Sequence, residues 1–145
     1  MTLIDTSAWI EFFRKAGDRD VKRRVATLLE LGQAALCGPI EFELLTGAAK
    51  REMATLREAF GYCERLEFSD ACWQRAAEIE SRLRSKGVTV PRDDVFVCAA
   101  ALVHDLPLLA CDQHFLQMRD RGKIRINVLH MELTHHKHPI GQKED

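Results

Sequence analysis

Residues 1–13 read MTLIDTSAWIEFF, a short apolar run followed by one acid and a second apolar stretch. The run at 1–4 is too short for a helix, so it predicts a buried strand that ends at Asp5. Thr6 or Ser7 can then start a helix, which we expect over 8–15. A buried strand that passes directly into a helix is typical of a parallel sheet covered by helices.

The rest of the chain repeats this alternation. We expect short strands over 34–37, 65–68, 107–110 and 124–129, and helices over 18–31, 40–49, 55–60, 70–86, from 93 onward and over 114–118. This order predicts the α/β class, a three-layer α/β/α sandwich with a short-stranded parallel sheet. Since 145 residues suit one domain, we expect a single domain over 1–133 and a polar, mobile tail over 134–145.

Composition narrows the classes of protein to consider. A formal net charge of −1 gives no overall basic field, although a local basic rim could still bind nucleic acid. Five cysteines without a CxxC pair indicate reduced thiols. No apolar stretch has the length of a membrane span, and the N-terminus lacks a basic leader. These features predict a cytoplasmic protein that does not bind membranes.

Four acids stand among apolar residues, where carboxylates are rarely found without a partner: Asp5, Glu43, Asp94 and Asp112. Asp5 and Asp112 follow predicted strands, and ligands of parallel sheets bind at the carboxyl ends of strands. Converging carboxylates would raise one another's pKa values and oppose folding, a conflict that a divalent cation removes. Oxygen ligands favour Mg²⁺, with Mn²⁺ as a second choice, over Zn²⁺. Such a site suits phosphodiester hydrolysis.

Each acid also has a simpler interpretation when it is taken alone. Asp5 and Asp112 could cap the helices that follow them. Glu43 could be an exposed helix residue, while Asp93 and Asp94 would both be favourable at a helix N-terminus. Only the ordered series, with acids at strand ends and at helix starts, favours a shared site.

Four segments of the chain resemble the PIN-domain family, and in particular the VapC-type toxins. They are LIDTSAWIEFF, EFELLTGA, PRDDVFVCAAAL and LLACDQHF, which occur in the family's order and span residues 3–115. The resemblance implies an α/β/α sandwich that acts as a Mg²⁺-dependent endoribonuclease, the toxin of a type II toxin–antitoxin pair. It also implies that Asp5, Glu43, Asp94 and Asp112 are the catalytic acids and metal ligands.

Neighbouring residues receive supporting roles, Thr6 and Ser7 from the same resemblance and Arg92 because it adjoins the proposed site. Thr6 and Ser7 supply hydroxyls that orient Asp5. Asp94 is the ligand of the acid pair because it stands three residues after Pro91, and Asp93 becomes the N-cap or a neighbour that helps to hold metal-bound water. Arg92 is the basic residue that we expect to contact RNA.

Glu41 is a rival to Glu43, and the two face nearly opposite sides of the expected helix. We prefer Glu43 because it precedes Leu-Leu-Thr-Gly, as in the family pattern.

The expected partners are RNA, an antitoxin that inserts a segment near the site, and a second copy of the chain. The apolar helix at 9–13 is one candidate surface for the homodimer. Trp9 and the two phenylalanines are better explained as core or interface than as a platform for stacking bases. Basic clusters at 14–15, 19–24, 50–51 and 119–125 could contact phosphates, or could simply be solvated helix faces.

Two alternative functions stay open. The chain could be a PIN-like nucleic-acid-binding module without turnover, or a metal-dependent phosphatase. The presence of all four acids argues against the first, and the lack of a nucleophile motif argues against the second.

Overall fold

The computed structural model of the chain describes residues 1–134. Its elements follow in the order β1 (Thr2–Ile4), α1 (Thr6–Phe13), α2 (Arg19–Glu30), β2 (Ala34–Cys37), α3 (Gly38–Gly47), the 3₁₀ turn η1 (Lys50–Glu52), α4 (Met53–Phe60), β3 (Glu64–Leu66), α5 (Asp70–Ser85), α6 (Arg92–Val103), β4 (Leu108–Ala110), α7 (His114–Asp120) and β5 (Val128–His130).

Five parallel strands form one sheet in the order β3-β2-β1-β4-β5. The central strand, β1, is buried along its whole length, which explains why its sequence is a continuous apolar run rather than an alternating one. Leu3 of β1 lies beside Ala35 of β2 and Leu108 of β4. This register brings the carboxyl ends of β1 and β4 together at one edge of the sheet.

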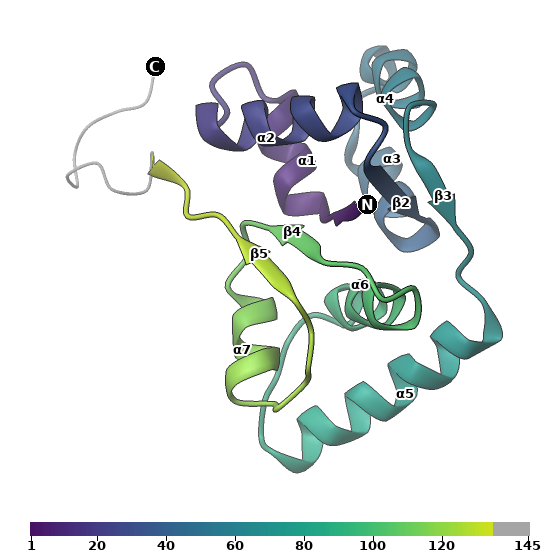
Figure 1. The fold of residues 1–145 in the computed structure, drawn as a ribbon, viewed down its shortest axis with the longest axis vertical. Helices are drawn as coiled ribbons and strands as arrows, with labels where there is room; N and C mark the ends of the chain where they lie inside the picture. Colours follow the sequence, from purple (N-terminus) through teal and green to yellow (C-terminus); the bar gives the residue numbers. More distant parts are fainter. Residues whose placement is uncertain (135–145) are drawn as a thin grey trace.

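Helices cover both faces of the sheet, so the predicted three-layer sandwich is confirmed. Helix α1 packs against α2 and α3, and α3 packs against α4. Helix α6 packs against α5 and α7, and it also contacts α3. Figure 1 shows α1, α2 and α4 on one side of the strands and α5, α6 and α7 on the other. This division follows from right-handed crossovers, because the chain moves from β1 towards β3 and then returns towards β5.

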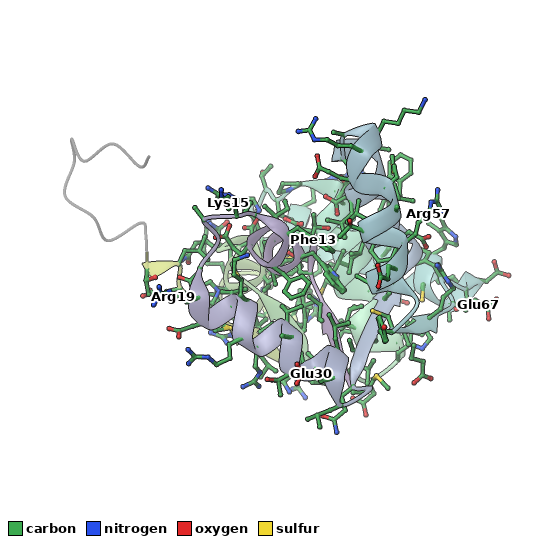
Figure 2. All side chains as sticks on the ribbon, turned by 90° about the horizontal axis from the view of Figure 1, so that it is seen from above. Phe13, Lys15, Arg19, Glu30, Arg57 and Glu67 are labelled. Carbon is green, nitrogen blue, oxygen red and sulfur yellow. The ribbon has the colours of Figure 1, made fainter. Side chains whose placement is uncertain are left out.

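The first layer is built around Trp9, which is completely buried. Its ring stacks on Phe13 with centroids 5.7 Å apart and meets Phe60 edge-on at 6.1 Å. In Figure 2, which looks down on this layer, Phe13 lies in the middle while Glu30 and Arg57 lie nearer the surface. Trp9 is therefore a core residue, and its side chain is not available for a dimer surface.

The C-terminal part of the chain differs from the prediction. The hydrogen-bonded strand is Val128–His130 rather than 124–129, because the preceding residues run past the sheet without pairing along its edge. Of the predicted tail, only Thr134 lies within the described residues. Its backbone N–H and hydroxyl both donate to Asp18 Oδ2, at 2.7 and 2.6 Å, so this residue is attached to the domain. Within residues 1–134, no helix combines the length and the apolar character that crossing a membrane requires.

Candidate metal centre

The candidate site lies where the chain leaves the two central strands. Asp5 directly follows β1, and Asp112 stands two residues after β4. Asp94 is the third residue of α6, whose first turn points to the same edge and whose next residues are buried almost without interruption. Parallel pairing of β1 with β4 therefore explains why acids more than a hundred residues apart share one edge.

Asp94, Asp112 and His114 form the closest group. The imidazole Nδ1 of His114 is 2.8 Å from Asp94 Oδ2 and 2.8 Å from Asp112 Oδ1. One ligand atom from each of the three residues lies within 4.8 Å of those of the other two. Asp94 is buried at 8% exposure, while Asp112 and His114 are half-buried, so the group can be reached from solvent.

Asp5 lies behind this group and is held firmly in place. Its Oδ2 accepts hydrogen bonds from the hydroxyl of Ser7 at 2.6 Å and from the backbone N–H of Ser7 at 3.1 Å. The same Ser7 oxygen accepts the backbone N–H of Cys111 at 2.9 Å. Ser7 thus ties the end of β1 to the segment that carries Asp112. Asp5 also caps α1, so the capping interpretation is confirmed for it, and its role as a metal ligand stays a prediction.

Glu43 comes from α3, where its carboxylate accepts a hydrogen bond from the Thr6 hydroxyl at 3.1 Å. The prediction that the Thr6 hydroxyl orients Asp5 is wrong, because this hydroxyl donates to Glu43. The rival acid, Glu41, forms a salt bridge with Arg65 of β3 instead. The preference for Glu43 over Glu41 therefore agrees with the structure, in which Glu43 is held by Thr6, next to Asp5, and Glu41 is held by Arg65.

Burial and mutual repulsion raise the pKa values of these acids. The pKa of Asp94 rises to about 7, first because the side chain is buried and then because Asp5 and Asp112 are close. Burial likewise raises the pKa of Asp5, with a contribution from Asp112. Burial and the neighbouring charge of Asp5 raise the pKa of Glu43. Negative charge is thus concentrated at this edge of the sheet, and the neighbouring side chains compensate it only in part.

The donor set fits a divalent cation. An octahedral ion with bonds of about 2.0–2.1 Å places neighbouring ligand atoms about 2.9 Å apart. The two contacts of the His114 ring nitrogen with carboxylate oxygens are 2.8 Å each. The Asp94 contact is a hydrogen bond in this structure, and the three side chains are close enough to share one ion. A cation would relieve the repulsion that raises the pKa of Asp94.

Of the roles predicted for the two neighbouring residues, only the N-cap alternative for Asp93 is wrong, and the contact of Arg92 with RNA stays a prediction. Asp93 is not the N-cap of α6, because Pro91 occupies that position and no side chain caps the helix. Asp93 stands in the first turn, where the helix dipole favours an acid. The Arg92 guanidinium is exposed and lies 3.7 Å from Glu80 of α5, so it is directed towards that helix.

His114 was missed by the sequence reasoning. Its segment, CDQHF, places it two residues after Asp112. The same two-residue step explains how Asp112 Oδ1 accepts the backbone N–H of His114 at 2.8 Å, although the N-cap position of α7 belongs to Gln113. A histidine at the start of a helix after a strand-end acid was the available signal, but its contact with Asp94 depends on tertiary structure.

Comparisons with known proteins agree with this architecture. The family model of the PIN domain matches residues 2–121. Ribonuclease VapC11 of Mycobacterium tuberculosis is 34% identical over 121 residues, which cover 79% of this chain and 89% of the relative.

Solved structures with the same fold include VapBC2 from Rickettsia felis bound to a promoter DNA fragment, with a TM-score of 0.73 and 16% identity over 90% of this chain and 98% of that one. A toxin–antitoxin complex from Klebsiella pneumoniae gives a TM-score of 0.67 and 20% identity over 89% of this chain and 96% of that one. The chain belongs to the PIN-domain family and, within it, to the group that contains the VapC ribonucleases.

Proposed function

We propose that this protein is a divalent-metal-dependent endoribonuclease that acts as the toxin of a type II toxin–antitoxin pair. The observation that carries the proposal is the convergence of Asp94, Asp112 and His114 at the carboxyl edge of the sheet. It is supported by the ribonuclease relatives, which cover most of this chain.

In the proposed site, Asp94, Asp112 and His114 hold the cation directly, and Asp5 and Glu43 complete the acidic surroundings. When bound, the cation activates water and offsets the negative charge that accumulates on the phosphate during hydrolysis. Ser7 keeps Asp5 in position, and Thr6 keeps Glu43 in position. Groups that orient metal ligands in this way usually contribute about 10- to 100-fold to activity or metal affinity.

Mg²⁺ is the cation that we propose for catalysis, with Mn²⁺ as the alternative. The carboxylates favour both ions, whereas an imidazole ligand favours Mn²⁺ relative to Mg²⁺.

Cleavage of a circular RNA tests the function, because only an endonuclease converts a circle into a linear product. We expect linear product with Mg²⁺ or Mn²⁺, none with a chelator, and recovery when excess metal is added back. An RNA-binding module would bind the circle and leave it intact in every condition. A phosphatase would instead release phosphate from p-nitrophenyl phosphate.

We propose an antitoxin as the protein partner, supported by the toxin–antitoxin complex among the similar structures. Co-purification of a small protein that blocks RNA cleavage would identify it. The homodimer implied by the family resemblance stays a prediction, and sedimentation of the purified chain tests it.

Replacing His114 with Asn is expected to change the metal preference. Loss of the ring nitrogen should weaken Mn²⁺ binding about tenfold while affecting Mg²⁺ less, because Mg²⁺ gains less from a nitrogen ligand. Calorimetric titration with each ion measures both affinities.

The histidines at 135, 136 and 138 could also bind Mn²⁺, so the titrations compare variants in a chain where these three are glutamine. His104→Asn is the matched control, since His104 contacts the Glu67 carbonyl outside the site. Equal losses for both ions would show that His114 only supports the carboxylates.

A further inference from the structure

A second polar region lies away from the acids, between α5 and the segment that connects α7 to β5. Five basic side chains and one acidic one line two adjoining hollows there: Arg75, Arg82, Arg119, Lys123, Arg125 and Glu78. We call this region the basic groove. In Figure 1, the C-terminal half of α5 and the loop after α7 lie at the bottom, on the side of the molecule opposite α2.

The backbone of the connecting segment is fixed, so the groove has a defined wall. Ile124 and Ile126 are buried at 6% and 4% exposure, whereas Lys123 and Arg125, which each precede one of them, are exposed. The backbone N–H of Ile124 donates to the Met118 carbonyl at 3.0 Å. Lys123 adopts a positive φ of 56° at the start of this segment, and both Lys123 and Arg125 line the two hollows.

Close packing at Gly122 restricts the segment between α7 and β5 further. A side chain at Gly122 would approach Leu83 to 2.4 Å and the Met118 carbonyl to 2.6 Å, so only glycine fits. The loop after α7 is therefore held against α5 at Gly122, its second residue.

Helix α5 supplies the opposite wall. Arg75 and Arg82 are seven residues apart and lie on the same face of the helix. The Arg82 guanidinium donates to the Lys123 carbonyl at 3.1 Å, which joins the two walls. The groove is thus formed by two rigid elements rather than by scattered surface side chains.

The charge of the groove is only partly compensated. Arg75 forms a salt bridge with Glu78, and Arg119 forms one with Asp120. Among the residues that the structure describes, neither Lys123 nor Arg125 has a salt bridge. Arg82 has no salt bridge among these residues either, and the pKa of Asp120 is lowered by Arg119 and, to a smaller extent, by the nearby Lys123. Lys123 and Arg125 are the exposed side chains of the connecting segment that we expect to exchange small counterions for a polyanion.

The ligand class follows from the lining of the groove. Its isoleucines lie in the floor, and none of the large exposed apolar residues of the chain lines it. A protein partner would need apolar anchors, which are absent here. A chain of phosphates needs fixed cations instead, and counterion release then drives binding.

The proposed nuclease needs such a surface. Its metal site is surrounded by acids that repel RNA, and the whole chain carries a formal charge of −1. Affinity for RNA must therefore come from a local cationic region. Helix α7 connects the two places: His114 at its start belongs to the metal site, and Arg119 near its end lines the groove. Seven helical residues span about 10 Å, a short distance for a single strand of RNA.

From these observations we infer that the basic groove binds the phosphodiester backbone of the RNA that is cleaved at the metal centre. The choice of RNA over another polyanion rests on the proposed function. The groove recognises phosphates without reading bases, so it sets the affinity for RNA rather than the site of cleavage.

Binding of a labelled single-stranded RNA of about 16 nucleotides to the full chain tests this inference. Anisotropy is measured with a chelator present, so that no cleavage is required. Lys123→Glu combined with Arg125→Glu should weaken binding about tenfold or more. The slope of log affinity against log salt should fall by about 1.4, as expected for two lost phosphate contacts.

Arg23→Glu combined with Arg24→Glu is the matched control, because these exposed residues of α2 undergo the same charge change on the far side of the molecule. The control should keep wild-type affinity. Equal weakening in both double variants would overturn the inference in favour of a general charge effect. Unchanged RNA binding with lost binding of the antitoxin would overturn it in favour of a protein partner.

A milder pair, Lys123→Gln with Arg125→Gln, covers the case in which the charge reversal disturbs folding, as judged by melting temperature. It should still reduce affinity and salt slope, and a wild-type slope in a folded glutamine variant would overturn the inference. If the chain bound RNA through the groove but never cleaved it, the groove would stand and the nuclease proposal would fail.

Discussion

Replacing Asp94 with Asn is expected to abolish RNA cleavage and growth arrest while leaving the fold intact. Asp94 is buried, contacts the His114 ring at 2.8 Å and belongs to the closest group of candidate ligands. Altering a group that merely orients a metal ligand costs about 10- to 100-fold, so loss of a ligand should cost at least about 100-fold. The amide keeps the shape of the side chain but removes the charge that attracts the cation. Initial cleavage rates at saturating metal measure the effect.

Asp93→Asn is the matched control for this prediction. The two acids are adjacent in the first turn of α6, and the substitutions remove the same charge. Asp93 lies outside the group of Asp94, Asp112 and His114 and caps no backbone group, so its replacement should lower rate or stability only modestly. Full toxicity of Asp94→Asn, or an equal loss in both variants, would contradict the assignment of Asp94 as a ligand.

The strand-end acids could be predicted because their signal is local. The runs before Asp5 and Asp112 are short and apolar, and each is followed at once by polar residues and a helix. These patterns determine strand ends, and parallel pairing then determines that the ends share an edge. The separation of the adjacent acids Asp93 and Asp94 is also local, because only one of two neighbours on a helix can face the sheet.

Hydrogen-bond partners could not be predicted in the same way. The Thr6 hydroxyl reaches Glu43, thirty-seven residues away, rather than the neighbouring Asp5. His114 meets Asp94 across twenty residues, and nothing in either segment specifies that contact. Such contacts depend on how α1 sits beside α3, and α6 beside α7, which is decided by packing of the core rather than by sequence pattern.

The last strand shows a third limit. Residues 122–127 alternate between buried and exposed positions, which is the pattern of a strand with one covered face. The alternation is real, but the residue pairing with β4 starts at Val128, just after the Asn127 carbonyl, which accepts the Leu108 N–H at 2.9 Å. Periodicity therefore identified an extended segment correctly and could not show whether it had a partner strand.

The stability of the metal-free protein is expected to fall as the pH rises from about 4 to about 7. In the folded chain the pKa of Asp94 is about 7, well above the ordinary value of an aspartate, because of burial and then the charges of Asp5 and Asp112. Folding thus keeps a proton that the unfolded chain releases between these values, and the free energy of unfolding decreases across that interval. The raised pKa values of Asp5 and Glu43 act in the same direction.

A bound cation should reverse this dependence, because it binds the deprotonated carboxylates. Its stabilising effect is therefore expected to increase over the same pH interval. Melting temperatures with chelator and with saturating Mn²⁺, between about pH 5 and pH 8, measure both trends. Asp94→Asn should show a shallower decline in chelator, a higher melting temperature than wild type at the alkaline end, and a smaller gain from metal. If Asp94→Asn loses activity but is more stable than wild type without metal, the charge of Asp94 serves cation binding rather than folding. A wild-type melting temperature that stays level in chelator would mean instead that the fold tolerates these carboxylates without any cation.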